Sequence, residues 1–251
     1  MGAVGERHIS ASGTPESHWA PFLPRVPACE LDGLVGATSR LVVVAPHPDD
    51  EVVACGGLVA AHAARGGRVS VIAVTDGEGS HPGSERWSRQ ALAERRRLES
   101  DQGLRSLGVA SHDVTRLGFP DGAVARYGGP LRETLALLLR AKDVVVSTWR
   151  LDGHPDHEAV GAAAEQACSE AGAVCLQAPV WMWHWSRVGD ARVPWERLHG
   201  LRLTQTALER KRLALSAHAT QLALRGPDGP VLDALILARA ARPAEYFFVN
   251  T

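Results

Sequence analysis

Two short segments of the sequence gather imidazoles and carboxylates at close spacing. The first, HPDDE, covers residues 47–51, and the second, GHPDHE, covers 153–158. His47 and Asp50 are three residues apart across a predicted helix start, so their side chains can point the same way from the first turn. His157 can enter from the second segment. Two imidazoles and one carboxylate form the ligand set of hydrolytic zinc sites, which keep a fourth position for water.

The other polar residues of the two segments suit the same chemistry. Water bound to zinc falls in pKa towards about 7 and becomes a hydroxide nucleophile. Asp49 lies next to a predicted ligand and can serve as its general base. His154 can stabilise the developing oxyanion or protonate the leaving amine, and both roles stay open. Asp156 can hold one imidazole in its tautomer. Glu51 is interpreted as a carboxylate of the helix start.

A simpler explanation exists for acidic residues at this position. Asp and Glu are common at helix N-termini as caps and as partners of the helix dipole. Capping does not explain why histidines flank both segments, each in an H-P-D context. We therefore favour metal binding. The isolated His62 is interpreted as structural or surface, and His184 and His218 are left unassigned.

Composition limits the class of protein. The 251 residues suffice for one α/β domain with a large core. A net charge of −1 gives no positive field that would attract nucleic acid or an anionic membrane. The four cysteines form no C-x-x-C pair, which favours buried thiols in a reducing cytoplasm. We find no signal-peptide pattern and no run of eighteen apolar residues. The sequence predicts a cytoplasmic protein without nucleic-acid or membrane partners.

Strands and helices are predicted to alternate along the chain. Short β-branched runs predict buried strands, and amphipathic segments predict the helices between them. This alternation is typical of βαβ units and predicts a single-domain, three-layer α/β/α fold with an open, mostly parallel sheet. The predicted strands are 40–45, 68–75, 114–119, 142–148, 173–177, 179–185 and 198–204, the last of them an edge strand. The predicted helices run from 49 to a stop at 66–67 and over 89–107, 130–141, 156–171, 205–222 and 231–239.

The predicted fold explains why the two polar segments matter together. Residues 47–51 follow the strand at 40–45, and residues 153–158 follow the strand at 142–148. In open α/β sheets, ligands bind outside the carboxyl ends of the strands. If the two strands are neighbours, both segments converge at that edge.

The N-terminal region is expected to differ from the rest of the chain. Residues 1–17 are rich in Gly, Ser and Thr and are predicted to be a mobile tail. Residues 18–40 carry Trp19, Phe22 and Leu23 among prolines and are predicted to be an arm docked on the body, which is residues 41–251.

The two histidine segments also resemble a known family. APHPDDEVVACGG together with GHPDHEAVG is similar to the PIG-L or LmbE-like deacetylases, which are metal-dependent N-deacetylases of sugar conjugates. Further matches extend the resemblance over roughly residues 40–225. It implies a Rossmann-like fold and one divalent metal ion per chain, usually zinc, with iron(II) possible. By motif position, the metal ligands would be His47, Asp50 and His157, and the catalytic residues Asp49, His154 and Asp156.

The resemblance also has implications for substrate recognition. Arg96 in an R-x-x-E pattern and Asp121 in PDG resemble positions that contact the sugar in family members. A helix-surface arginine and a turn aspartate are equally good interpretations. One position departs from the mycothiol-pathway branch, which has a tyrosine two residues before the second-segment histidine. This chain has Asp152 there, which weakens an assignment to that branch.

The segment VWMWHWS is predicted to be a strand with its tryptophans on one face. Trp181, Trp183 and Trp185 alternate, as expected of side chains sharing a strand face. Such a stripe is more often a half-buried sheet face or a subunit surface than a sugar platform. All three interpretations stay open.

We expect a hydrolase that removes an acetyl or other small acyl group from an N-acylated amino-sugar conjugate or a related small molecule. Two alternatives are an amidase acting on a non-sugar biosynthetic intermediate and a catalytically weak protein that holds a metal and binds a metabolite. The presence of Asp49 favours an enzyme. A metallo-phosphoesterase would usually need two metals and more ligands. A monomer and a homo-oligomer are both compatible with the sequence.

Overall fold

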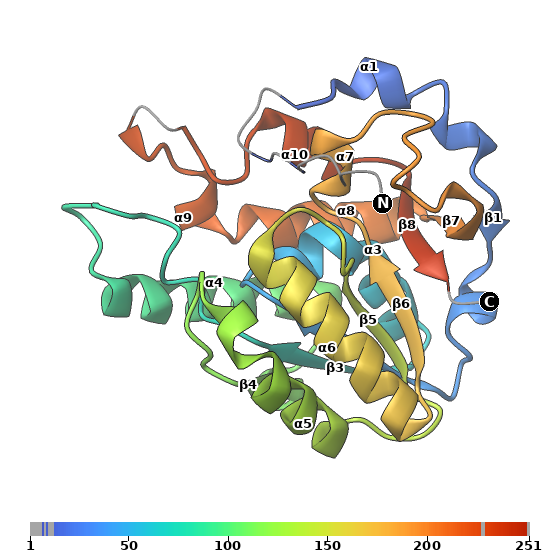
Figure 1. The fold of residues 1–251 in the computed structure, drawn as a ribbon, viewed down its shortest axis with the longest axis horizontal. Coiled ribbons are helices and arrows are strands. Elements are labelled where there is room, and N and C mark those ends of the chain that lie inside the picture. The colour runs from blue at the N-terminus through green and yellow to red at the C-terminus, as the bar shows by residue number, and fades with distance from the viewer. Residues whose placement is uncertain (1–6, 8, 10–12, 227–228, 250–251) are drawn as a thin grey trace, which may run out of the picture.

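One sheet of eight strands forms the middle layer of the protein, with helices on both of its faces (Figure 1). The structure is a computed structural model that describes residues 7, 9, 13–226 and 229–249. The strands are β1 (Ala28–Cys29), β2 (Arg40–Ala45), β3 (Arg68–Ala73), β4 (Val114–Arg116), β5 (Val144–Thr148), β6 (Val174–Ala178), β7 (Leu198–Arg202) and β8 (Ala244–Val249). Their spatial order is β1-β7-β8-β6-β5-β2-β3-β4, and only the pairings of β8 are antiparallel.

Helices of different length cover the sheet. They are α1 (Glu16–Trp19), α2 (Leu31–Leu34), α3 (Asp50–Ala64), α4 (Arg89–Leu107), α5 (Gly128–Leu138), α6 (Pro155–Ala171), α7 (Met182–Trp185), α8 (Gln205–Ser216), α9 (Ala219–Leu222) and α10 (Ala234–Ala240). No helix among the described residues is long and apolar enough to cross a bilayer. The predicted single-domain α/β/α architecture with a mostly parallel sheet is confirmed.

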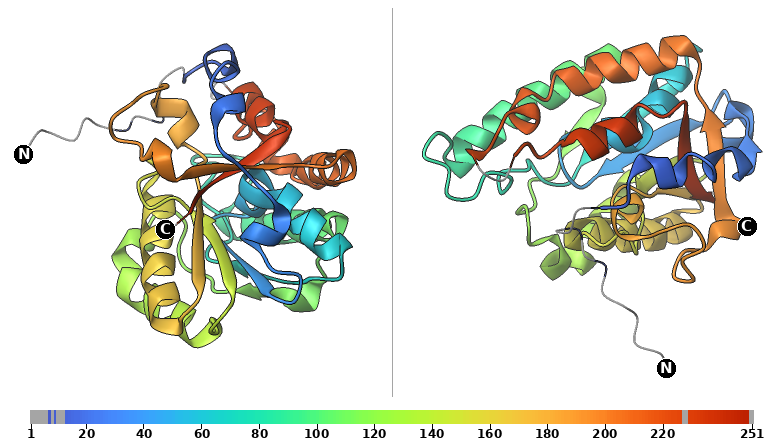
Figure 2. Two further views of the ribbon diagram at one scale, coloured as in Figure 1. Left: turned by 90° about the vertical axis from the view of Figure 1, so that its right-hand side faces the viewer. Right: turned by 90° about the horizontal axis from the view of Figure 1, so that it is seen from above.

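The β-branched run of β2 explains why both faces of the sheet are covered. Successive side chains of a strand point to opposite faces. Val43 packs with residues of α3, α4 and α8 on one face, whereas Val42 and Val44 pack with residues of α5 and α6 on the other. Figure 2 shows these two groups of helices on opposite sides of the sheet. A strand with apolar side chains on both faces of the sheet is expected to be central. β2 indeed lies between β5 and β3.

Two strand predictions are wrong. Residues 179–185 contain the short helix α7 instead of a strand. The backbone N–H groups of Val180, Trp181 and Met182 donate to the buried carboxylate of Asp152, so they are not available to a strand partner. Their tryptophans therefore do not form one stripe.

The segment at 198–204 is a strand but does not lie at the edge of the sheet. β7 lies between β8 and the two-residue β1, and the register pairs Ala28 with Gly200. The prediction assigns the edge position to β7 because the true edge strand, β1, is too short to give a sequence pattern. The predicted helix at 205–222 is also divided, with α8 ending before α9 begins.

The N-terminal segment contacts the body. Trp19 is fully buried, and its indole N–H donates to the carbonyl oxygen of Trp183 at 3.1 Å. In the described part of the predicted tail, Thr14 donates to the carbonyl oxygen of Ser186, and Glu16 pairs with Arg242. Residues 1–6, 8 and 10–12 of the tail lie outside the described residues. The division into tail, arm and body stays a prediction.

Candidate metal centre and active-site cleft

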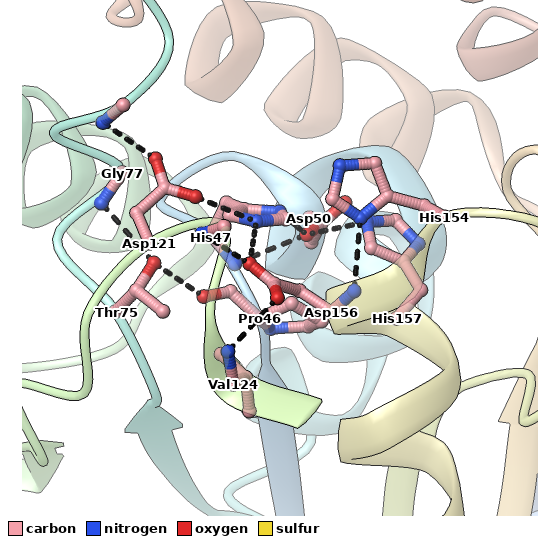
Figure 3. Close-up of polar contacts among 12 residues, drawn as sticks. Pro46, His47, Asp50, Thr75, Gly77, Asp121, Val124, His154, Asp156 and His157 are labelled. Atoms are coloured by element: carbon pink, nitrogen blue, oxygen red, sulfur yellow. Dashed lines mark hydrogen bonds and ion pairs between the residues drawn. The ribbon is translucent and has the colours of Figure 1, made fainter. Parts of the chain in front are cut away.

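The two histidine segments meet at the carboxyl edge of the sheet (Figure 3). His47 and Asp50 follow β2, whereas His154 and His157 follow β5. Because β2 and β5 are adjacent and parallel, their carboxyl ends lie side by side. The residues that sequence analysis placed at one edge are therefore in contact, although about a hundred residues separate them in the chain.

His47, Asp50 and His157 form a compact donor set. Oδ2 of Asp50 lies 3.0 Å from Nδ1 of His47 and 3.2 Å from Nε2 of His157. One donor atom from each of the three residues lies within 4.8 Å of the other two. Zinc–ligand bonds are about 2 Å long. The three side chains can therefore converge on one ion after small rotations.

The second nitrogen of each imidazole is held by another carboxylate. Nδ1 of His157 lies 2.8 Å from Oδ2 of Asp152, which is fully buried. Nε2 of His47 lies 3.3 Å from both Asp121 and Asp156. Metal-binding histidines usually donate their second N–H to such a partner, which leaves the first nitrogen as the ligand. The residues present therefore fit a divalent ion.

The carboxylates around the donor set favour the protonated forms of the two imidazoles. Burial lowers the pKa of His157, but Asp50 and Asp152 outweigh it and raise that pKa to about 9. Burial raises the pKa of Asp50, whereas His157 and His47 hold it well below its usual range. For His47, the contacts with Asp121, Asp156 and Asp50 overcome burial and raise the pKa well above its ordinary value. The site is built to compensate positive charge.

A second donor set shares one residue with the first. His47, His154 and Asp156 also bring one donor atom each within 4.8 Å of the others. The carboxylate of Asp156 accepts from the backbone N–H groups of Gly122 and Val124. These bonds engage both oxygens of Asp156, whereas Asp50 accepts one backbone N–H, that of His47, and faces two imidazoles. The first set is thus the better match to a metal centre.

Asp49 lies beside the donor set in an unusual backbone conformation. Its φ is 136°, a region that residues other than glycine rarely adopt. Oε2 of Glu51 accepts the N–H of Asp49 at 2.9 Å, and Ser100 donates to Oε1 of Glu51 at 2.8 Å. Arg96 donates to Oδ2 of Asp49 at 3.1 Å and to the carbonyl oxygen of Pro48. Contacts from α4 therefore support the strained loop.

The environment of Asp49 suits proton transfer. Burial raises its pKa to about 7, and the guanidinium of Arg96 opposes that rise. A carboxyl group with a pKa near neutrality can both accept and return a proton at neutral pH.

His154 stands at the start of α6 and faces the cleft. Its Nδ1 accepts the backbone N–H of Asp156 at 3.2 Å. Burial and the neighbouring His157 and His47 lower its pKa to about 3. The ring is therefore neutral, and with Nδ1 accepting, its proton resides on Nε2. The indole ring of Trp181 stacks beside the imidazole of His154, with ring centroids 6.4 Å apart.

Arg96 and Asp121 both line the cleft, but their polar groups contact the protein. Arg96 is almost fully buried and also donates to the carbonyl oxygen of Gly77 at 2.7 Å. Asp121 accepts the N–H of Gly79 at 2.7 Å and faces His47. Their predicted contact with substrate stays a prediction.

Two supporting residues escaped sequence analysis. The sequence marks Asp152 only as the position where the mycothiol-pathway branch has a tyrosine. In the structure it orients His157 and accepts three backbone N–H groups. Its position in the loop after β5, five residues before His157, was the available signal. Ser100 lies one turn after Arg96 on α4 and gave no signal of its own.

A cleft of about 550 Å³ opens above these residues. It is lined by Ile9, by residues from the loops and helix starts that follow five adjacent strands, and by residues of the segment that runs from α9 to α10. Its lining includes His47, Asp49, Asp50, Arg96, Asp121, His154 and His157. A volume of this size is typical of small-molecule sites.

Fold and site together define a class: a three-layer, mostly parallel α/β protein with a candidate divalent-metal site where the strands end. The model of the PIG-L (GlcNAc-PI de-N-acetylase) family matches residues 42–168, about half of the sequence. The chain belongs to this family.

Individual relatives agree with that membership. The chain is 33% identical over 148 residues to 1D-myo-inositol 2-acetamido-2-deoxy-alpha-D-glucopyranoside deacetylase 1 of Catenulispora acidiphila, covering 48% of this chain and 45% of that protein. The chain spans about half the length of the first curated relatives it matches.

Solved structures share the fold. The conserved protein TT1542 from Thermus thermophilus has a TM-score of 0.59 and 26% identity, with 84% of this chain and 94% of that chain covered. The A40926 pseudoaglycone deacetylase Dbv21 has a TM-score of 0.61 and 25% identity, with 84% and 97% covered.

Proposed function

We propose that this protein is a zinc-dependent hydrolase that removes an acyl group from the nitrogen of an amino-sugar conjugate. The observation that carries the proposal is the His47–Asp50–His157 donor set with Asp49 beside it in one cleft. Membership of the de-N-acetylase family and the names of the deacetylase relatives support the reaction type.

The metal ligands in this proposal are His47, Asp50 and His157. A divalent ion held by them would supply Lewis-acid activation of a water molecule and of the amide carbonyl. Two imidazoles and one carboxylate favour zinc, and iron(II) is the alternative. Asp152 positions His157, and Asp121 and Asp156 position His47.

The protein's own groups then handle the protons. Asp49 accepts a proton as water adds to the carbonyl carbon. Neutral His154 donates a hydrogen bond from Nε2 to the carbonyl oxygen as negative charge develops there. When the C–N bond breaks, Asp49 returns the proton to the amine. Of the two roles left open for His154, the tautomer set by the N–H of Asp156 favours oxyanion stabilisation.

The substrate class rests on the polar residues of the cleft. Ser80, Arg89, Asp121, Gln221 and Arg225 line it, and such groups can bind sugar hydroxyls. Oε1 of Gln221 is buried without a hydrogen-bond partner among the described residues, and a non-sugar substrate with no donor for it would leave it unpaired, which is costly. We therefore favour an amino-sugar conjugate.

The test combines metal analysis with hydrolysis. The purified protein would be analysed for zinc and iron, and incubated with a panel of N-acylated amino sugars and non-sugar amides while free amine is detected. We expect one divalent ion per chain and amine release from the sugars. A metal-loaded protein that releases no amine from any member would contradict the proposal and favour a binding protein.

A further inference from the structure

The cleft has two chemically different ends, and the sheet order explains why. From β6 through β5, β2 and β3 to β4, the strands are consecutive neighbours. The loops after β5 and β2 carry the metal donors and therefore lie in the middle. The loop after β6 lies at one end, and the loops after β3 and β4 lie at the other. Figure 1 shows α7 near the first end and α9 near the second.

The polar end consists of Ser80, Arg89, Asp121, Gln221 and Arg225. These residues contact one another: Gln221 donates to Oγ of Ser80, Arg225 to the carbonyl oxygen of Ser80, and Arg89 to the carbonyl oxygen of Asp121. Oε1 of Gln221 is buried without a hydrogen-bond partner among the described residues. This end offers donors and an unused acceptor to a polar ligand.

Four of the apolar lining residues, Val53, Val180, Trp181 and Ile236, form the apolar end, whereas Leu232, whose N–H donates to the carbonyl oxygen of Gln221, lies beside the polar end. Val53, Val180 and Ile236 also line a second, small pocket of about 30 Å³, which shows that they lie together. Val53 follows Asp50 by three residues on α3, and Trp181 stacks beside His154. The apolar surface therefore begins next to the metal donors.

A bound amide must extend in both directions from the metal centre. Its carbonyl carbon has to lie at the donor set, and the planar amide directs its acyl group and its nitrogen substituent away from each other. The sugar hydroxyls need hydrogen-bond partners, which the polar end supplies. The acyl group is then left to face the apolar end.

The methyl group of an acetyl is small for this surface. Val53, Val180 and Trp181 are only half-buried, and beyond a methyl group their exposed apolar surface would remain in contact with water. Apolar contact area is what stabilises a ligand at such a place. Resting on the proposed function, we infer that the apolar end is a subsite for an acyl chain longer than acetyl, so that the substrate is an N-acyl amino sugar with an extended aliphatic acyl group.

The first experiment varies only the acyl chain. Methyl glucosaminides carrying N-acetyl, N-butanoyl, N-hexanoyl and N-octanoyl groups would be compared by kcat/KM with the metal-loaded enzyme. Each buried methylene is expected to raise kcat/KM by up to about fourfold until the subsite is full. Binding of the same series to a non-hydrolysing Asp49→Asn variant, measured by calorimetry, should show the same order and a negative heat-capacity change.

Variants connect the preference to these residues. Ile236→Asn should lower the ratio of hexanoyl to acetyl kcat/KM by about tenfold, because a polar group replaces buried apolar surface. Val180→Ser is the second variant if Ile236→Asn does not fold, since Val180 is only half-buried. Leu137→Asn is the matched control because Leu137 is 87% exposed on α5, on the other face of the sheet. This control should leave the ratio unchanged.

Three results would overturn the inference. Hydrolysis of the N-acetyl substrate with kcat/KM flat or falling along the series would remove the acyl subsite and leave the proposed function standing. A preference for an N-acetyl glucosaminide with an octyl aglycone over the N-octanoyl methyl glucosaminide would assign the apolar end to the aglycone. Hydrolysis of no N-acyl sugar at all would contradict the proposed function itself, and this inference with it.

Discussion

At the scale of single residues, Asp49 combines backbone strain with a chemical role. Its positive φ places the carboxylate beside the metal donors, whereas Asp50, the next residue, points at the imidazoles. Strain of this kind persists only where the surroundings hold it, and here Glu51 and Arg96 do so. Two adjacent aspartates can therefore have different functions.

We predict that Asp49→Asn keeps the metal and loses turnover. Asparagine has nearly the same shape as aspartate, so the loop should survive, but the amide cannot act as a base. General-base assistance typically contributes about 10²–10⁴-fold in rate. Metal content and kcat would be measured together, with His157→Ala as the comparison that should lose both. Loss of metal from Asp49→Asn would identify Asp49 as a ligand instead.

Asp152 leads to a second prediction. Asp152→Asn should weaken metal affinity by about 10–100-fold, because the carboxylate that orients His157 is replaced by a neutral amide. Competition with a chelator would measure the affinity. Asp143→Asn serves as control, since Asp143 is a buried aspartate that pairs with Arg40 at the other end of β5. Equal affinity in wild type and Asp152→Asn would show that His157 needs no such partner.

At the scale of elements, α3 is divided by a break that sequence analysis did not predict. Cys55 has non-helical backbone angles (φ −148°, ψ 21°), which frees backbone groups on either side. Glu245 of β8 accepts the N–H groups of Gly57 and Leu58, and Lys211 of α8 donates to the carbonyl oxygen of Val53. The Lys211–Glu245 ion pair, 2.7 Å long, thus caps both halves and sets the direction of the half that carries Asp50.

We predict that Lys211→Met destabilises the fold by about 3–5 kcal/mol, because it leaves the buried Glu245 carboxylate without its counter-charge. Lys211→Met combined with Glu245→Gln should recover part of the loss, since the amide oxygen can still accept an N–H. Urea denaturation would measure both. Arg212→Met, at the exposed next position on α8, should change stability by less than about 0.5 kcal/mol. A similar effect from Arg212→Met would mean that the pair is unimportant.

At the scale of the whole molecule, acid stability depends on a histidine in the core. His218, between α8 and α9, is fully buried, and neither ring nitrogen has a hydrogen-bond partner among the described residues. It packs against Gly103 of α4, where a Cβ would lie 3.1 Å from its Nε2. Burial and Arg96 lower the pKa of His218 to about 3. The folded protein therefore keeps this ring neutral at pH values where the unfolded chain protonates it.

His218 therefore lowers the stability of the folded protein only in acid. Above the unfolded pKa of about 6.5, His218 has no effect on the pH dependence of stability. As the pH falls from 6.5 towards 3, the unfolded state binds the extra proton and stability decreases, by about 2 kcal/mol at pH 5. His218→Gln should show a correspondingly shallower loss between pH 7 and pH 5 in urea denaturation. His112→Gln, in which an exposed imidazole is changed, should follow the wild type. Parallel curves for His218→Gln and wild type would contradict the prediction.

The sequence alone determined the α/β class and the central strands, because uninterrupted β-branched runs such as 40–45 can only be buried on both faces of a sheet. It also located both histidine segments, since polar residues directly after such strands must lie at the sheet edge. Interactions between distant segments were decided only by the tertiary structure. Asp152 draws the N–H groups of 180–182 away from a strand, β1 takes the edge position from β7, and Lys211 and Glu245 divide α3. Each outcome depends on a partner far away in the chain, and local periodicity carries no information about such partners.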